Sequence, residues 1–197
     1  ALVMGTVLGV AGLFMKAHAA DAGVLYIIDS IGGTPESVTE DCTDSAGGWS
    51  YDAGTATLTL DGFQGEYIEA NGDINIVLKG KNKITISAES TEGIKSTGKV
   101  TIDNKISPVQ DCLDIYCNDG TESVSMIYTG GFGADYATYI VGGTVNLVEE
   151  NTRRRYVTGI SRWAYVENDA SLNINLSADG GRNGAAALLN LNTSGDT

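Results

Sequence analysis

Arginines and aromatic residues gather in one short stretch of this 197-residue chain, which has only 12 lysines and arginines in total. The stretch contains Arg153, Arg155, Arg162, Trp163 and Tyr165. If residues 152–157 form a strand, Arg153 and Arg155 share one face of it. Guanidinium groups bind carboxylates through paired hydrogen bonds, and aromatic rings present apolar surface to a sugar. The cluster therefore predicts contact with an acidic polysaccharide; the alternative is a solvated basic turn that pairs with Glu149 and Glu150.

Carboxylates gather at a second position, around a turn. They are Asp111, Asp114, Asp119 and Glu122. Calcium takes roughly six to eight oxygen ligands, so this turn could supply several of them. With an arginine or lysine beside the ion, the site could also remove the proton α to a uronate carboxylate. The alternative is an ordinary polar turn, since the spacing is not that of an EF-hand loop.

The three cysteines do not have a metal-binding spacing. In an extended strand, Cys112 and Cys117 would lie roughly 16 Å apart, whereas a disulfide requires Cα atoms within about 7 Å. Cys117 is expected on the buried side of that strand as a free thiol, and Cys112 on the outer side. Cys42 could pair with either.

Tyrosines mark a glycine-rich stretch. Tyr128, Tyr136 and Tyr139 lie in it together with Phe132. Glycine permits the backbone conformations of tight loops. The stretch therefore predicts either a loop that projects and contacts a ligand, or rings that pack on the flank of the fold.

Residues 1–19 are expected to be a secretory signal peptide whose start is missing. The segment is apolar through Phe14, and Ala17 and Ala19 place small residues before a cleavage site. The alternatives are a retained membrane anchor and a buried N-terminal helix. Cleavage would remove His18, the single histidine. Histidine-dependent catalysis and histidine-ligated zinc would then be unavailable to the mature protein.

The composition limits the remaining function classes. A formal net charge of −13 opposes binding to the phosphates of nucleic acids. The 26 glycines indicate many tight turns, and a hydrophobic content of 42% is enough for a packed core. One folded domain is therefore expected after the signal segment.

Short runs of alternating apolar and polar residues predict strands over most of the chain. The clearest runs are 57–60, 73–78, 83–86, 99–102, 123–126, 144–147 and 171–176. Comparable strands begin at Ile74, Val100, Val124, Val145 and Leu172. A repeat of about 20–28 residues with short strands is typical of a parallel β-solenoid. We therefore predict an all-β, right-handed, single-stranded parallel β-helix; the alternative is an antiparallel sandwich.

The same repeats predict the domain organisation. Residues 20–48 are expected to form an N-terminal strand or cap region, and residues 49–197 the coils of the β-helix. The last repeat begins at Gly184 and is incomplete at Thr197. An uncapped coil exposes a sheet edge, so we expect the coils to be truncated at this point.

Two stretches resemble a known family. Residues 48–62 (GWSYDAGTATLTLDG) and 72–86 (GDINIVLKGKNKITI) are similar to the opening of bacterial secreted β-helix proteins called carbohydrate-binding domain-containing proteins. Gly93-Ile94, 142–147 and Gly159-Ile160 resemble the coil repeats of that family. The resemblance implies a fold similar to that of pectate lyases and binding of plant polysaccharide with bound calcium.

These observations predict a secreted or cell-surface domain that binds polysaccharide without catalysis, with acidic plant-type glycans as the expected ligands and calcium as the candidate cofactor. Polysaccharide and further domains of the same protein are the expected partners; nucleic acid and a membrane span in the mature chain are not expected. Two alternatives remain. One is an adhesin stalk or self-assembling structural protein, and the other is a calcium-dependent polysaccharide lyase.

Overall fold

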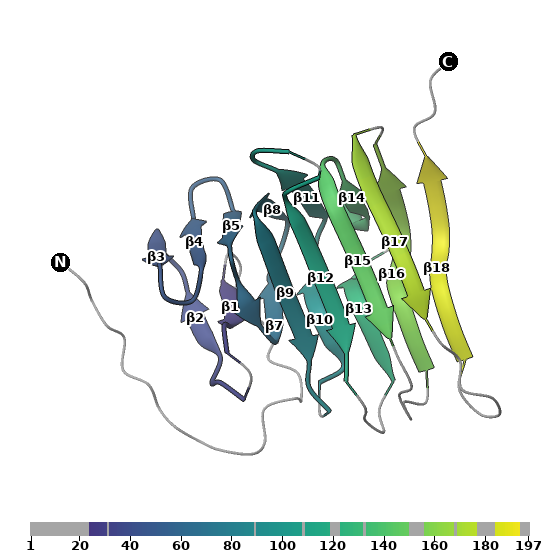
Figure 1. Cartoon of the computed structure of the whole chain (residues 1–197), viewed down its shortest axis with the longest axis horizontal. Coiled ribbons are helices and arrows are strands. Elements are labelled where there is room, and N and C mark those ends of the chain that lie inside the picture. Colours follow the sequence, from purple (N-terminus) through teal and green to yellow (C-terminus); the bar gives the residue numbers. More distant parts are fainter. Residues whose placement is uncertain are drawn as a thin grey trace.

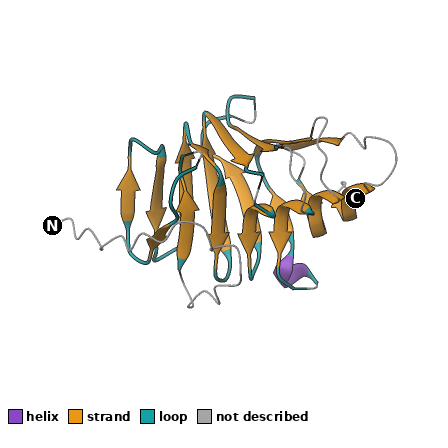
Figure 2. Ribbon diagram, turned by 90° about the horizontal axis from the view of Figure 1, so that it is seen from below, coloured by secondary structure: helices purple, strands orange, loops and turns teal. Residues whose placement is uncertain are grey.

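The computed structural model describes residues 24–30, 32–88, 90–107, 109–118, 123–131, 133–149, 156–167, 169–176 and 184–193. Within these residues the protein is built from strands, with one short 3-10 helix at Ala134–Tyr136 (Figure 2). The all-β prediction is confirmed. None of the described helical residues forms a helix long and apolar enough to cross a membrane. The predicted signal segment lies outside the described residues.

Most of the strands are short, and most of the predicted runs fall on strands. In chain order they are β1 Leu25–Ile28, β2 Glu36–Val38, β3 Cys42–Asp44, β4 Trp49–Asp52, β5 Thr57–Asp61, β6 Gln64–Gly65, β7 Tyr67–Ala70, β8 Ile74–Lys79, β9 Lys81–Ile86, β10 Glu92–Ser96, β11 Val100–Asn104, β12 Cys112–Cys117, β13 Val124–Thr129, β14 Thr138–Ile140, β15 Gly143–Glu149, β16 Tyr156–Val166, β17 Ala170–Leu176 and β18 Gly184–Thr193.

Parallel pairing arranges most strands in three columns (Figure 1). The first column contains β7, β10, β13 and the first half of β16. The second contains β5, β8, β11, β14 and the second half of β16. The third contains β6, β9, β12, β15 and β17. The chain visits the columns in a constant order, because β7, β8 and β9 are followed by β10, β11 and β12, and then by β13, β14 and β15.

Antiparallel pairs occur at the N-terminal end of this arrangement. β1 lies between β2 and β7, and β4 lies between β3 and β5. Because β16 pairs with both β13 and β14, the first two columns form one mixed, nearly closed sheet of 13 strands. The finer prediction of a single-stranded parallel β-helix is not decided by this mixed sheet and stays a prediction.

Two of the predicted equivalences between strands are confirmed by the register. Ile74 pairs with Val100 in the second column, and Val145 pairs with Leu172 in the third. In each pair both residues lie at the corresponding position of neighbouring parallel strands. The alternation of apolar and polar residues therefore identified these neighbours correctly.

The equivalence of Val100, Val124 and Val145 is wrong. Val100 pairs with Thr138 in the second column, whereas Val124 pairs with Val157 in the first. All three columns carry inward β-branched residues at alternate positions, so spacing alone does not identify the column. The connection at 130–137 also separates Val100 from its partner by more than the predicted repeat.

The core lies between the columns and consists of inward apolar residues stacked in register. Each column contributes such a ladder, with fully buried side chains. They are Ile68, Ile94, Ile127 and Ile160 in the first column, Ile76, Ile102 and Ile140 in the second, and Ile84, Ile115 and Leu147 in the third. Burying one such side chain contributes about 1.5–3 kcal/mol, so these ladders hold the columns together.

Cys112 and Cys117 lie as predicted, and Cys42 pairs with neither of them. Cys117 is buried, Cys112 is half-buried on the outer side of β12, and Cys42 is exposed. All three are free thiols.

Candidate functional site

The outer surface of the second column carries a continuous row of polar and aromatic side chains, here called the outer row. Its members are in register across β4, β5, β8, β11, β14 and β16. They are Asp52, Thr57, Asn75, Thr101, Tyr139 and Tyr165. Paired strands are about 4.8 Å apart, so one hydrogen-bonding group follows another at that interval. This interval is comparable to the length of one sugar ring.

The outer row exists because the strands of this column alternate strictly. In β5 the leucines Leu58 and Leu60 are fully buried, so Thr57 and Thr59 face outward. In β8 the buried Ile74 and Ile76 leave Asn75 exposed. Inward packing therefore fixes which polar groups the surface presents.

A shallow groove of about 420 Å³ adjoins the row at the N-terminal end. Strands β3, β4 and β5 line it, largely with hydroxyl and carboxylate groups. Its lining includes Thr43, Ser50, Asp52, Thr55, Thr57 and Thr59. Thr55 and Thr57 hydrogen-bond through their hydroxyls at 2.9 Å, and the Asn75 amide donates to the Thr55 carbonyl at 3.2 Å. The groove lies outside the sites predicted from the sequence, although the outward threonines of β5 were a signal for it.

Two stacked tyrosines form the opposite end of the row. The rings of Tyr139 and Tyr165 have centroids 4.6 Å apart and are nearly parallel. The Lys99 ammonium lies 5.8 Å from the centroid of the Tyr139 ring. Burial, followed by the nearby Tyr165 and Asp135, raises the pKa of Tyr139. Because one face of Tyr139 covers Tyr165, a ligand meets the edges and hydroxyls of this pair more readily than their stacked faces.

The glycine-rich connection before β14 projects beyond the strands at its 3-10 helix (Figure 2). It is joined to the tyrosine pair, because the Tyr139 hydroxyl donates to the Ala134 carbonyl at 3.4 Å. Tyr136 is exposed on the connection, whereas Tyr128 lies in β13 and Tyr139 in β14. The two predicted alternatives, projection and packing on the flank, thus apply to different tyrosines; Phe132 lies outside the described residues.

The predicted arginine and aromatic cluster is divided between two surfaces. Trp163 and Tyr165 flank the buried Ala164, so both face outward on the second half of β16. Arg162 occupies a bulge with φ of 84°, and its guanidinium lies 6.0 Å from the centroid of the Tyr128 ring in the first column. The bulge thus directs Arg162 away from the outer row. Arg153 and Arg155 lie outside the described residues.

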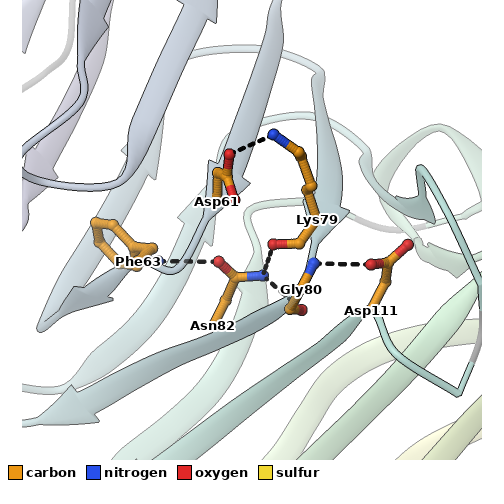
Figure 3. A network of polar contacts seen from close by, with 6 residues as sticks. All are labelled: Asp61, Phe63, Lys79, Gly80, Asn82 and Asp111. Carbon is orange, nitrogen blue, oxygen red and sulfur yellow. Dashed lines mark hydrogen bonds and ion pairs between the residues drawn. The ribbon is translucent and has the colours of Figure 1, made fainter.

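Asp111, a predicted calcium ligand, is buried where the chain turns from β11 into β12 (Figure 3). Its carboxylate accepts backbone N–H groups from Gly80 at 2.7 Å, Ile106 at 2.5 Å and Ser107 at 2.9 Å. Burial opposes ionisation, but these N–H groups outweigh it and lower the pKa of Asp111. The carboxylate therefore fixes the backbone at Ile106 and Ser107.

Asp114, the second described member of that predicted site, lies on the outer side of β12. It accepts a hydrogen bond from the Asn146 amide at 2.6 Å, and Asn146 accepts one from Asn173 at 2.8 Å. Asp114 thus begins a row of amides across the third column. Asp119 and Glu122 lie outside the described residues. In the described part of the chain, no three histidine, cysteine or acidic side chains are grouped to hold a metal ion.

Asn82 is a structural residue that the sequence analysis did not identify. Its side chain is buried in β9, where the Oδ1 atom accepts the Phe63 N–H at 3.0 Å (Figure 3). Its amide group donates to the Cys112 carbonyl at 3.2 Å and the Gly80 carbonyl at 3.3 Å. Asn82 therefore joins the ends of three neighbouring strands in the third column. Asn82 and Asp111, with their backbone partners, are called the corner network below.

No family model, curated protein or solved structure matches the chain. The function must therefore be argued from its own residues.

Proposed function

We propose that this protein is a secreted or cell-surface domain that binds polysaccharide without catalysis, and that its strands form a right-handed parallel β-helix. The observation that carries the proposal is the outer row, in which hydroxyl, amide and phenol groups follow one another across six strands in register. A linear glycan offers hydroxyls at a similar interval. The row can therefore hydrogen-bond several consecutive sugar units.

The order of the strands supports the β-helix. Each column is revisited after the other two, and residues in register are 26 apart for Ile74 and Val100 and 32 apart for Asp114 and Asn146. Connections between parallel strands of one sheet are nearly always right-handed. Stacked coils also account for ladders of identical residues, such as the isoleucines of the first column.

Charge favours a neutral glycan for this surface. Asp52 is the one formally charged member of the outer row, and Lys99 lies over the ring of Tyr139. Among the arginines predicted to bind sugar carboxylates, the described one, Arg162, contacts Tyr128. Calcium-dependent binding of an acidic glycan is the competing outcome, and it would depend on residues other than the outer row.

The chemistry of the row favours binding over hydrolysis. Glycosidases use a pair of carboxylates on the two sides of the bond that they break. The outer row and its groove offer two carboxylates, Asp52 and Asp41, and both already accept backbone N–H groups, from Thr55 at 3.1 Å and from Ala53 at 2.9 Å. We therefore propose a lectin-like role for this surface.

Affinity electrophoresis against neutral and acidic polysaccharides, with calcium or a chelator, tests the proposal. We expect retardation by a neutral glycan that chelation leaves unchanged. Thr101→Val removes one outward hydroxyl at constant shape and should weaken binding about fivefold, the effect of roughly 1 kcal/mol for one hydrogen bond. Thr144→Val, at a half-buried outer position of the third column, is the matched control and should not change binding. Failure to bind any glycan, or equal losses in both variants, would contradict the proposal.

A further inference from the structure

Two carboxylates lie next to each other in the groove at the N-terminal end of the outer row. Strands β3, β4 and β5 lie side by side there (Figure 1), and Asp41 and Asp52 belong to the lining of the groove. Cys42 and Tyr51 are paired in the antiparallel register of β3 and β4. Asp41 and Asp52 adjoin that pair and are therefore opposite each other. Like charges directly opposite in a sheet are destabilising, so the fold alone does not account for these two residues.

In the described part of the chain, no positively charged side chain pairs with these carboxylates. The sequence has no lysine or arginine between Lys16 and Lys79. Lys79 forms an ion pair with Asp61, at the other end of β5. The ion pairs among the described residues include neither Asp41 nor Asp52. The groove therefore presents negative charge to a cation from outside.

Each carboxylate has one oxygen bound to the backbone and one that can accept from a ligand. Oδ1 of Asp41 accepts the Ala53 N–H at 2.9 Å. Oδ1 of Asp52 accepts the Thr55 N–H at 3.1 Å. The Thr55 hydroxyl donates to the Thr57 hydroxyl at 2.9 Å, so the Thr55 oxygen can still accept a hydrogen bond. Because the backbone holds the carboxylates, a ligand loses little further side-chain entropy on binding them.

We propose that the groove binds the protonated primary amine of an amino sugar, an inference that rests on the proposed glycan-binding function. A primary ammonium group has three N–H donors, which two carboxylate oxygens and one threonine hydroxyl can accept. The hydroxyls of Thr43, Ser50 and Thr59 in the same groove suit the hydroxyls of the sugar. The rest of the outer row would then bind the adjoining neutral sugar units.

Two other cations could enter the groove, but they fit its lining less well. Calcium takes roughly six to eight oxygen ligands, whereas the groove has two carboxylates that each already use one oxygen. Among the described residues, no three acidic, cysteine or histidine side chains are grouped to hold a metal ion. A lysine side chain of another protein carries the same ammonium group. Its apolar stem, however, offers no partner to the hydroxyls of the groove.

Calorimetric titration at low salt with a glucosamine hexamer and with its fully N-acetylated counterpart tests the inference. The two ligands have the same sugar backbone and differ only in the acetyl groups. We expect the amine form to bind about tenfold more tightly, and added salt to reduce the difference. Asp41→Asn and Asp52→Asn should each reduce the difference about threefold, since exposed ion pairs are weak. Asp103→Asn removes the same charge at an exposed position of β11 and is the matched control.

Thermal unfolding serves as the folding control, and we expect no change because asparagine keeps an oxygen that can accept the same backbone N–H. Equal affinity for the two hexamers, or an equal loss in Asp103→Asn, would overturn the inference. A requirement for calcium would assign the groove to a metal ion, and equally tight binding of a lysine hexamer would reduce the effect to charge attraction.

The failure of this inference differs from the failure of the proposed function. If the protein binds a neutral glycan but does not prefer the amine form, only the inference about the groove is wrong. If the protein binds no glycan of any kind, the proposed function is wrong as well.

Discussion

The corner network and the outer row contain the same types of residue, but these residues have different roles. In the corner network they support the fold, and in the outer row they are available to a ligand. In the corner network, Asp111 and Asn82 are buried, and their polar atoms bind backbone groups at strand ends and in the connections between strands. In the outer row, Asp52 and Asn75 are exposed, and each makes one hydrogen bond with a nearby backbone group. Residue type therefore does not separate a structural polar group from one that is available to a ligand. The number of hydrogen-bond partners and the burial of the side chain distinguish the two.

The largest effect that the comparison predicts is at Asp111. Asp111→Ala would leave the N–H groups of Gly80, Ile106 and Ser107 without their acceptor. Hydrogen bonds to a charged group are strong, so we expect a loss of about 3 kcal/mol in the free energy of unfolding, measured by urea denaturation. The matched change Asp52→Ala in the outer row should cost less than about 1 kcal/mol. Equal losses would contradict the distinction.

The Asp111 carboxylate predicts a pH dependence of stability. The pKa of Asp111 is lowered in the folded protein. Its contribution to the free energy of unfolding is therefore complete above the ordinary pKa of 3.8 and is lost as the pH falls through the lower pKa of the folded state. Asp111→Ala should remove this part of the acid sensitivity, whereas Asp52→Ala should retain it. Urea denaturation across the acidic range would measure the difference.

A somewhat smaller effect is expected at Asn82. Asn82→Leu would keep most of the side-chain volume but leave the buried N–H of Phe63 and the Cys112 carbonyl unsatisfied. We expect a loss of about 2 kcal/mol in the free energy of unfolding. Asn75→Leu is the control in the outer row and should change it by less than about 0.5 kcal/mol. Similar midpoints of denaturation for the two variants would show that the corner network is not needed.

The sequence was sufficient to predict strands such as β5 and β8, in which inward and outward residues alternate strictly. It did not predict β7 or β10, in which buried residues are consecutive. It was not sufficient to assign Val124 to its column, because inward valines and isoleucines look alike in all three. Asp111 and Asn82 escaped correct prediction for a related reason. Their partners are backbone groups, some of them far away in the sequence, such as Gly80 for Asp111 and Phe63 for Asn82, and side-chain patterns do not encode these contacts.

The candidate site was predicted in part. Trp163 and Tyr165 do share an outward surface, as their spacing of two in a strand requires. The bulge that directs Arg162 toward Tyr128 could not be predicted, since positive φ is uncommon for arginine. Tyr139 reaches Tyr165 only through the register of β14 and β16.

The smallest effect concerns two threonines that face opposite sides of neighbouring strands. Thr138 is fully buried, and its hydroxyl has no hydrogen-bond partner among the described residues, whereas Thr101 faces outward. Replacing a buried, unsatisfied hydroxyl with a methyl group removes a desolvation cost, so Thr138→Val should raise the free energy of unfolding by about 1 kcal/mol. Thr101→Val should change it by less than about 0.5 kcal/mol while weakening glycan binding. Thermal melts and affinity electrophoresis of both variants separate the two roles. Destabilisation by Thr138→Val would mean that the Thr138 hydroxyl has a hydrogen-bond partner. Loss of glycan binding in Thr138→Val would contradict the assignment of ligand contact to the outer face of the sheet.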